Sequence, residues 1–192
     1  MGIMASDNGG DFEPVPAGMH RATCVNVFDV GYQPGYQGAP PAHKVVVLWE
    51  IEPLNSQHKH FTVTRIYTLS IGDKSNLGND LTTWRGRPFT AEERRGFDLD
   101  NIIGKPCQLN LVQNGDKVKI AGVMPATMIP DATTRKNVPA GYWTIETKRD
   151  YIPNFVKKML ESQIAPPSKA KAPQPAAAGA APGDDFTDDI PF

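Results

Sequence analysis

One hairpin pattern constrains the fold of this chain most. Residues 106–113 (PCQLNLVQ) and 117–124 (KVKIAGVM) each alternate between apolar and polar side chains, and Asn114-Gly115-Asp116 separates them. Alternation with a period of two is typical of a strand with one buried face, and an Asn-Gly step favours the tight turn of a β-hairpin. The sequence therefore predicts two adjacent antiparallel strands and, with them, a β-rich fold.

Three more strands are expected before this hairpin. Residues 21–30 are rich in Val, Thr and Phe, and residues 60–71 form another apolar stretch behind the polar turn 55–57. Between them, residues 44–52 place four apolar side chains on one face: Val45, Val47, Trp49 and Ile51. β-branched and aromatic residues favour strands. We expect Trp49 to lie in the core because its face is otherwise aliphatic.

Helical spacing is expected between the third and fourth strands. Ser75 is a suitable N-cap for a helix whose apolar side chains recur at Leu77, Leu81 and Trp84. A shorter helical stretch opens near Thr90 and is followed by the apolar residues Leu99, Ile102 and Ile103 before Gly104. We therefore predict a helical insertion over roughly residues 76–104.

The remaining ordered element is a helix over residues 151–164. Its apolar side is formed by Ile152, Phe155, Val156 and Met159. Residues 32–41 are rich in Gly and Pro and are expected to form a loop. Residues 126–147 are ambiguous, although residues 142–145 (YWTI) have the composition of a short strand.

These elements predict a fold class. Five strands with a helix between the third and fourth form the layout of the OB-fold, a small and partly open Greek-key barrel. The expected fold is therefore mainly β, a five-stranded OB-fold barrel with a helical insertion, a C-terminal helix and a disordered tail. A different small β-barrel or a sandwich stays open as the alternative.

Composition divides the chain into four segments. Residues 1–17 are predicted to be a flexible arm, residues 18–165 the folded domain, residues 166–183 a disordered Pro/Ala-rich linker, and residues 184–192 an acidic tip. The net charge is −1, but residues 14–165 hold 18 basic and 14 acidic side chains. A domain charge of +4 is compatible with phosphate binding without being diagnostic of it.

Several function classes find little support in the residues. The sequence has no phosphate-binding loop, dinucleotide-binding glycine pattern or GxSxG nucleophile motif. We therefore expect neither an enzyme nor a cofactor. Cys24 and Cys107 are the only cysteines, and both lie in apolar stretches where a buried free thiol is the favoured interpretation. We expect a cytoplasmic protein without a metal site or membrane segment.

The C-terminal sequence is the most specific motif. It reads DDFTDDIPF, and its last five residues resemble the acidic tip of bacterial single-stranded DNA-binding proteins. In such a tip the terminal ring and carboxylate can enter a partner pocket together, while the aspartates are attracted to a basic rim. The residues expected to bind partner proteins are Asp184, Asp185, Asp188, Asp189, Ile190, Pro191 and Phe192.

The body of the chain also resembles a family. Residues 65–90 (RIYTLSIGDKSNLGNDLTTWRGRPFT) and 97–112, together with 12–31 and 43–52, are similar to bacteriophage single-stranded DNA-binding proteins. The resemblance implies an OB-fold that coats and protects single strands during phage replication, recombination or repair in the cytoplasm of an infected bacterium. An adaptor that binds proteins instead of DNA is the alternative, and homo-oligomer formation stays open.

Single-strand binding requires cations for phosphates and flat rings for bases. OB-folds bind across strands 2 and 3 and the loops that join strands 1–2 and 4–5. The candidate DNA contacts are Tyr32, Tyr36, Lys44, Lys59, His60, Arg65, Tyr67, Trp84, Arg85, Arg87, Phe89, Lys117 and Lys119. Each has a structural alternative: Trp84 is suited to packing a helix onto the barrel, Tyr67 to the core, and the two lysines to a solvated strand face. A strand bulge or a groove position would explain Arg65 on an apolar face.

Overall fold

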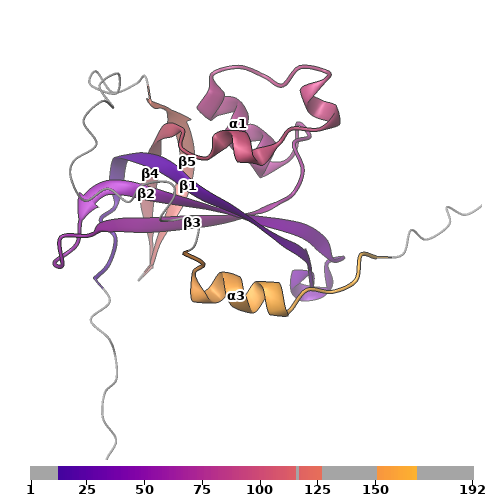
Figure 1. The fold of residues 1–192 in the computed structure, drawn as a ribbon, viewed down its shortest axis with the longest axis horizontal. Coiled ribbons are helices and arrows are strands. Elements are labelled where there is room, and N and C mark those ends of the chain that lie inside the picture. The colour runs from indigo at the N-terminus through magenta and orange to yellow at the C-terminus, as the bar shows by residue number, and fades with distance from the viewer. Residues whose placement is uncertain (1–12, 116, 127–150, 168–192) are drawn as a thin grey trace, which may run out of the picture.

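The computed structural model describes residues 13–115, 117–126 and 151–167. Its elements follow one another as β1 (Gly18–Gln33), η1 (Tyr36–Gly38), β2 (Ala42–Leu54), β3 (His60–Thr68), α1 (Asn76–Arg85), η2 (Glu93–Arg95), η3 (Leu99–Ile102), β4 (Pro106–Asn114), β5 (Lys117–Pro125) and α3 (Asn154–Glu161) (Figure 1). The predicted five strands, the helix between the third and fourth strands, and the C-terminal helix are all present.

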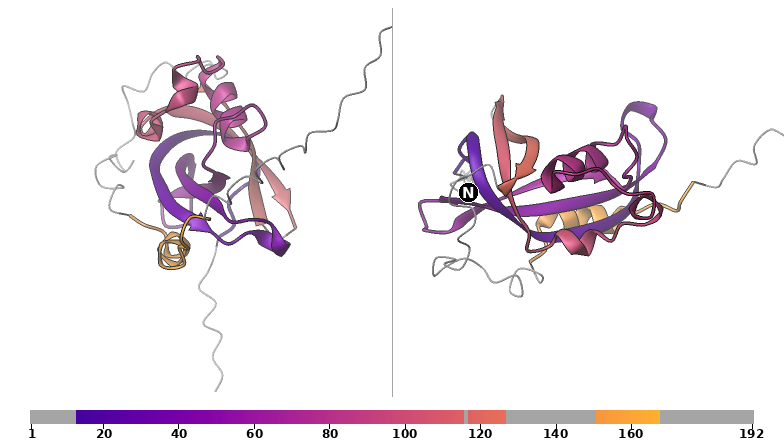
Figure 2. Two further views of the ribbon diagram at one scale, coloured as in Figure 1. Left: turned by 90° about the vertical axis from the view of Figure 1, so that its right-hand side faces the viewer. Right: turned by 90° about the horizontal axis from the view of Figure 1, so that it is seen from above.

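The strands form one antiparallel sheet in the order β3-β2-β1-β4-β5. The 16-residue β1 lies at its centre, pairing with β4 through its first half and with β2 along most of its length. Register shifts between Cys24 and Asn26 and between Asp29 and Tyr32 bend β1, as bulges do. Figure 2 shows the resulting curl of the sheet seen end-on. The sheet is not closed, and β3 and β5 are its edges.

The main core lies inside this curl. Val45, Val47, Trp49 and Ile51 are buried on one face of β2, as their alternation predicts. α1 covers the same core with Leu77, Leu81 and Trp84. Cys24 and Cys107 are buried free thiols in it, and desolvation raises the pKa of Cys24. The apolar periodicities therefore identified the core correctly.

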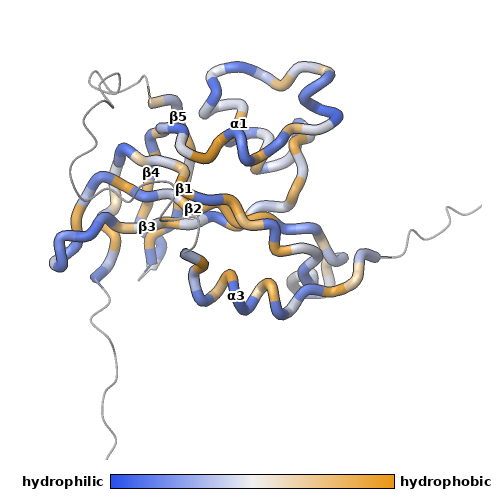
Figure 3. Tube along the Cα trace, in the orientation of Figure 1, coloured by the Kyte–Doolittle hydropathy of each residue, from blue (hydrophilic) through white to orange (hydrophobic). Residues whose placement is uncertain are grey.

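The opposite face of β2 carries a smaller core under α3. Val156 of α3 is fully buried against Val30 and Val46, and Ile152 and Met159 pack beside it. Phe155, expected on the same side, is instead 39% exposed. Figure 3 shows the alternation of apolar and polar residues along α3 that this docking uses. Both faces of β2 are thus covered, which simple alternation did not predict.

The local signals for α1 are confirmed. The Ser75 hydroxyl accepts a hydrogen bond from the Gly78 backbone N–H at 3.0 Å, and Gly86 ends the helix in the left-handed region at φ 68°. Both devices satisfy backbone groups that helix ends leave unpaired. The connection to β4 contains only the short 3-10 turns η2 and η3, not an α-helix.

Several element boundaries differ from the prediction. β1 continues through Tyr32 and Gln33, which the Gly/Pro content predicts to be loop, β3 ends at Thr68 instead of residue 71, and α3 is shorter than the helix expected over residues 151–164. Part of the expected arm packs on the domain: Val15 contacts the main core, and the Glu13 carboxylate accepts the Ser56 N–H at 2.6 Å. The possible strand near residues 142–145, the linker from residue 168 and the acidic tip lie outside the described residues. No described helix has the length and hydropathy to cross a membrane.

Candidate nucleic-acid interface

Three of the predicted base-stacking rings are in the core. Tyr67, Trp84 and Phe89 are 3%, 8% and 6% exposed. Trp84 donates its indole N–H to the Pro106 carbonyl at 2.7 Å, and Phe89 meets Phe97 edge to face with centroids 5.2 Å apart. A buried ring offers no face to a base, so these three residues are not part of the candidate interface. The structural alternatives given for Tyr67 and Trp84 are therefore confirmed, and the burial of Phe89 is a further finding.

Arg65 is held by a partner that the strand pattern did not reveal. Its guanidinium donates to the Asp80 carboxylate at 2.8 Å, and the Tyr67 hydroxyl donates to the same oxygen at 2.6 Å. Burial, followed by the negative charge of Asp80, raises the pKa of Tyr67. The register of β2 and β3 is regular at Arg65, so no bulge lies there, and the ion pair with Asp80 accounts for a cation on this face. This network joins β3 to α1.

Arg85 and Arg87 converge on Glu93. Arg85 contacts the Glu93 carboxylate and lies over the rings of Phe89 and Phe97, at 4.5 and 5.0 Å from their centroids. Arg87 binds both carboxylate oxygens, at 2.8 and 3.0 Å. The hydrogen bond from Arg87, followed by that from the Thr90 N–H, lowers the pKa of Glu93 to about 2.

The same glutamate also orders the chain after α1. Glu93 accepts the Thr90 N–H at 2.9 Å, and the Thr90 hydroxyl accepts the Glu93 N–H at 3.2 Å. This reciprocal pair is a capping box. In the cluster at residues 84–89, which resembles a DNA surface in the sequence, both arginines are therefore paired with Glu93 and the rings of Trp84 and Phe89 are buried, while the Arg87 side chain is still 54% exposed.

Apart from the arginines paired with Asp80 and Glu93, among them Arg87 with 54% of its side chain exposed, the candidate contacts that are exposed or half-buried fall near the two ends of β3. At its start, Lys59 is exposed in the β2–β3 turn and His60 is half-buried, with its Nδ1 2.8 Å from the Glu52 carbonyl. Lys117 and Lys119 are exposed on β5. Neither lysine forms an ion pair with another described residue.

A groove lies beside these positions, and Lys117 lines it. It has a volume of about 280 Å³ and lies between the edges of the sheet, where β3 contributes Thr62, Val63 and Thr64 and β5 contributes Lys117, Val118 and Ile120. Among the described residues, β3 pairs only with β2 and β5 only with β4. The groove therefore offers threonine hydroxyls, a lysine and edge backbone groups to a ligand.

At the other end of β3 lies a second group. Tyr32 of β1 stacks on His43 of β2 with ring centroids 5.0 Å apart and planes 28° apart. Lys44, the next residue, donates to the Thr68 hydroxyl at 2.8 Å. Tyr36 is in η1, and its side chain lies outside the described part of the structure.

One extended ligand could contact both groups. His60 and Leu69 are nine residues apart, which corresponds to about 30 Å along a strand. In Figure 1 the strands β2 and β3 run horizontally between these ends, with α1 above and α3 below. We define the candidate interface as the exposed and half-buried residues at both ends together with polar residues at the groove: Tyr32, His43, Lys44, Lys59, His60, Thr62, Thr64, Leu69, Lys117 and Lys119.

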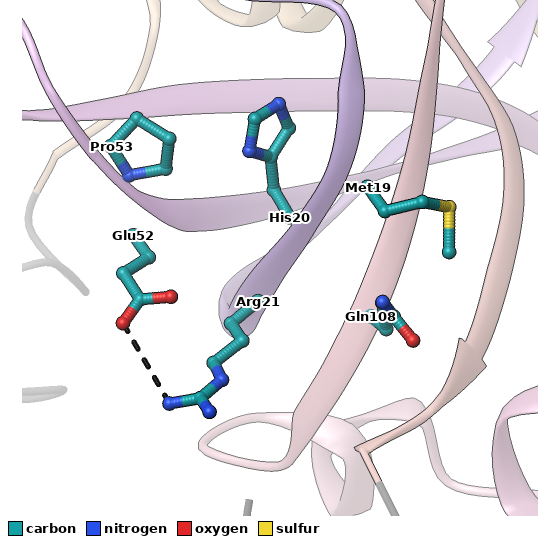
Figure 4. A pocket seen from close by; sticks show the side chains of 6 residues that line it. All are labelled: Met19, His20, Arg21, Glu52, Pro53 and Gln108. Carbon is teal, nitrogen blue, oxygen red and sulfur yellow. Dashed lines mark ion pairs between the residues drawn. The ribbon is translucent and has the colours of Figure 1, made fainter. Parts of the chain in front are cut away.

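A second cavity, of about 370 Å³, is less suited to nucleic acid. Met19, His20, Arg21, Glu52, Pro53 and Gln108 line it. Figure 4 shows Arg21 and Glu52 pointing toward each other across 3.8 Å, with His20 and Met19 directed elsewhere. His20 Nε2 lies 2.8 Å from the Pro16 carbonyl. The carboxylate of Glu52 offsets the one guanidinium, so a phosphate gains little here.

Sequence reasoning missed four residues that decide the site. Asp80 is three residues after Leu77 and four before Trp84, so helical spacing alone places it on the buried side of α1. Glu93 follows Thr90 at the spacing of a capping box. His43 and Leu69 are placed beside Tyr32 by strand register, which a single sequence does not give.

Comparison with known proteins does not assign a family. No protein-family model matches the chain, and no curated protein matches it. Function is therefore inferred from the geometry and the sequence of the chain itself.

Proposed function

We propose that this protein binds single-stranded DNA without sequence preference through an OB-type barrel. It coats and protects single strands in phage DNA replication, recombination or repair, in the cytoplasm of an infected bacterium, and recruits partner proteins with its acidic C-terminal tip. It is not an enzyme, and it acts without a cofactor.

The observation that carries the proposal is the strand order. β1 pairs with both β2 and β4, the edges of β3 and β5 line one groove, and α1 is inserted between β3 and β4. A partly open five-stranded barrel of this layout binds oligonucleotides on its strand 2–3 face and adjoining loops. The exposed candidate contacts lie at the two ends of β3.

The chemistry of these contacts supports binding without base readout. Lys59, Lys117 and Lys119 can neutralise phosphates of any sequence. The Tyr32–His43 ring pair, which is half-buried, can stack on any base through its accessible surface. The span of about 30 Å between the two ends suits a strand of several nucleotides, because one OB domain occupies about 4–16. Affinity is therefore expected to fall with salt and to depend little on sequence.

The tip supports the recruitment part of the proposal. Four aspartates and a terminal Ile-Pro-Phe follow a linker rich in Pro and Ala. Proline limits the conformational freedom that docking removes, and the free terminal carboxylate of Phe192 offers a second contact besides its ring. A tethered tip of this kind can contact a partner while the domain remains on DNA.

Fluorescence anisotropy of the full chain with a labelled dT oligonucleotide at several salt concentrations tests the proposal. We expect binding at micromolar protein or below, weaker binding at higher salt, a difference below about a hundredfold between dT and mixed sequence, and poor competition by duplex. No binding at micromolar protein and low salt would contradict the proposal.

The groove between β3 and β5 favours one second candidate. Its apolar lining and free strand edges suit an extended peptide, which could add as a strand. The protein would then be a replication adaptor whose OB-like domain binds protein. Absence of a shift with the dT oligonucleotide, together with retained partner recruitment by the tip, would favour the adaptor.

A further inference from the structure

Three side chains form a row across the end of the sheet. Tyr32 of β1 is paired with His43 of β2. The Leu69 N–H, just beyond β3, donates to the His43 carbonyl at 2.8 Å and extends the pairing of Lys44 with Thr68 by one residue. Residues directly opposite one another on adjacent antiparallel strands have their side chains on the same face. Tyr32, His43 and Leu69 therefore share one face.

The rings in this row are fixed in orientation. Tyr32 stacks on His43, and His43 Nε2 lies 2.6 Å from the Asp29 carboxylate. The same carboxylate oxygen accepts the Gly31 N–H at 2.9 Å. Burial opposes the charge of Asp29, but these two contacts outweigh it and lower its pKa. The carboxylate is thus ionised, and it holds the imidazole against the tyrosine.

α3 and the segment that follows it form hydrogen bonds with Tyr32 and Gln33. Ile164 donates its N–H to the Tyr32 carbonyl at 3.0 Å. The neighbouring Gln33 amide donates to the Met159 carbonyl at 2.9 Å and accepts from the Ser162 hydroxyl at 3.2 Å. Gly31 permits this approach, because it has φ +65° and a Cβ there would lie 2.7 Å from Gln163. The tyrosine is therefore preorganised.

The row is also accessible. The His43 side chain is 32% exposed, Leu69 is 38% exposed and Tyr32 is half-buried, whereas Tyr67, the next apolar residue along β3 on the same face, is buried under α1. A flat ligand is the chemical match, since two fixed rings and an aliphatic side chain offer stacking and apolar area with little ordering on binding.

We propose that Tyr32, His43 and Leu69 form a subsite for one nucleobase of the bound strand. Asp29, Gly31 and the segment after α3 act as positioning residues. Lys44 lies on the opposite face of β2 and takes no part in the base contact. This subsite rests on the proposed single-strand binding and gives it a specific location.

Photo-crosslinking of the full chain to a dT oligonucleotide substituted with 5-iodouracil tests the subsite. Mass spectrometry is expected to find the crosslink on Tyr32 or His43. Crosslinks found only elsewhere, with the oligonucleotide bound, would overturn the subsite and leave the proposed function standing. Failure of the wild-type chain to bind any single-stranded DNA would contradict both the subsite and the proposed function.

The dT affinity of single-residue variants tests the contact between the subsite and the base in solution. Tyr32→Ala and His43→Gln are expected to weaken dT binding about 5- to 100-fold each. Tyr32→Phe keeps the ring and is expected to bind like wild type, even if Tyr32→Ala folds poorly. Leu160→Ala is the matched control for Leu69→Ala, because Leu160 is 37% exposed on α3. Equal affinity of His43→Gln and wild type, or equal losses of affinity in both leucine variants, would overturn the subsite.

Discussion

Two regions of this domain contain arginine, lysine or histidine beside aromatic rings, and they differ in what surrounds those rings. In residues 84–97, Arg85 and Arg87 share Glu93, and the rings of Trp84 and Phe89 are buried. At the end of β1 and β2, Tyr32 and His43 stack on each other and are half-buried, with the His43 side chain 32% exposed. Ring surface is therefore accessible in the second region, whereas Trp84 and Phe89 offer almost none.

The difference teaches that a nearby acid, more than the basic residues themselves, separates a structural cluster from an interface. Asp80 and Glu93 each neutralise an arginine that looked available in the sequence. A guanidinium placed between rings and a carboxylate would have to break these contacts to reach a phosphate. The exposed lysines of β5 have no such competitor among the described residues.

The largest expected effect is on stability, at Trp84. Trp84→Ala removes a buried ring and its hydrogen bond to Pro106, and is expected to lower the free energy of unfolding by about 3–5 kcal/mol. Urea unfolding measures this change. Trp84→Phe keeps most of the ring and should retain a fold with unchanged dT affinity. A stable Trp84→Phe variant that binds dT much more weakly would place Trp84 at the interface after all.

A smaller destabilisation is expected at Asp80. Asp80→Ala leaves Arg65 and the Tyr67 hydroxyl without their shared acceptor, and should destabilise the domain by about 1–3 kcal/mol. Asp80→Asn, which keeps an acceptor oxygen, should be destabilised less. Binding to dT is expected to stay the same in Asp80→Asn. Tighter binding in that variant would show that Arg65, once released, contacts DNA.

The salt dependence of DNA affinity tests whether the exposed lysines of β5, Lys117 and Lys119, contact phosphates. Lys117→Ala combined with Lys119→Ala should reduce the slope of log affinity against log salt by about one unit for each phosphate that is no longer neutralised. Thermal stability should be unchanged. The control pair Lys157→Ala and Lys158→Ala on α3 should leave the slope as in wild type. An equal change of slope in both pairs would mean that general charge, not this site, steers binding.

Glu93 gives a smaller effect that depends on pH. Its folded pKa of about 2 lies below its ordinary value of 4.5, so its stabilisation is present above about pH 4.5 and is lost as pH falls toward 2. Glu93→Gln should therefore be less stable than wild type at neutral pH, and the two should converge between pH 4.5 and 2. A difference that persists undiminished at pH 2.5 would show that ionisation of Glu93 is not its cause.

Much of the fold could be predicted from the sequence because it depends on local patterns. Alternation located the strands, and Ser75 located α1. The interface could be predicted only in part. The lysines of β5 are exposed as expected and Tyr32 is half-buried. In the cluster at residues 84–89, the sequence could not reveal that Arg85 and Arg87 pair with Glu93, because this pairing depends on a loop conformation. His43 could be identified as a candidate contact only from its strand register with Tyr32.

Hydroxyl-radical footprinting of the full chain with and without saturating dT oligonucleotide tests the central comparison most directly, because it reports side-chain exposure at each residue. We predict that Tyr32, His43 and Leu69 are oxidised in the free protein and protected by the oligonucleotide, while the low oxidation of Trp84 and Phe89 does not change. Protection within residues 84–97, without protection of Tyr32, His43 and Leu69, would contradict the account.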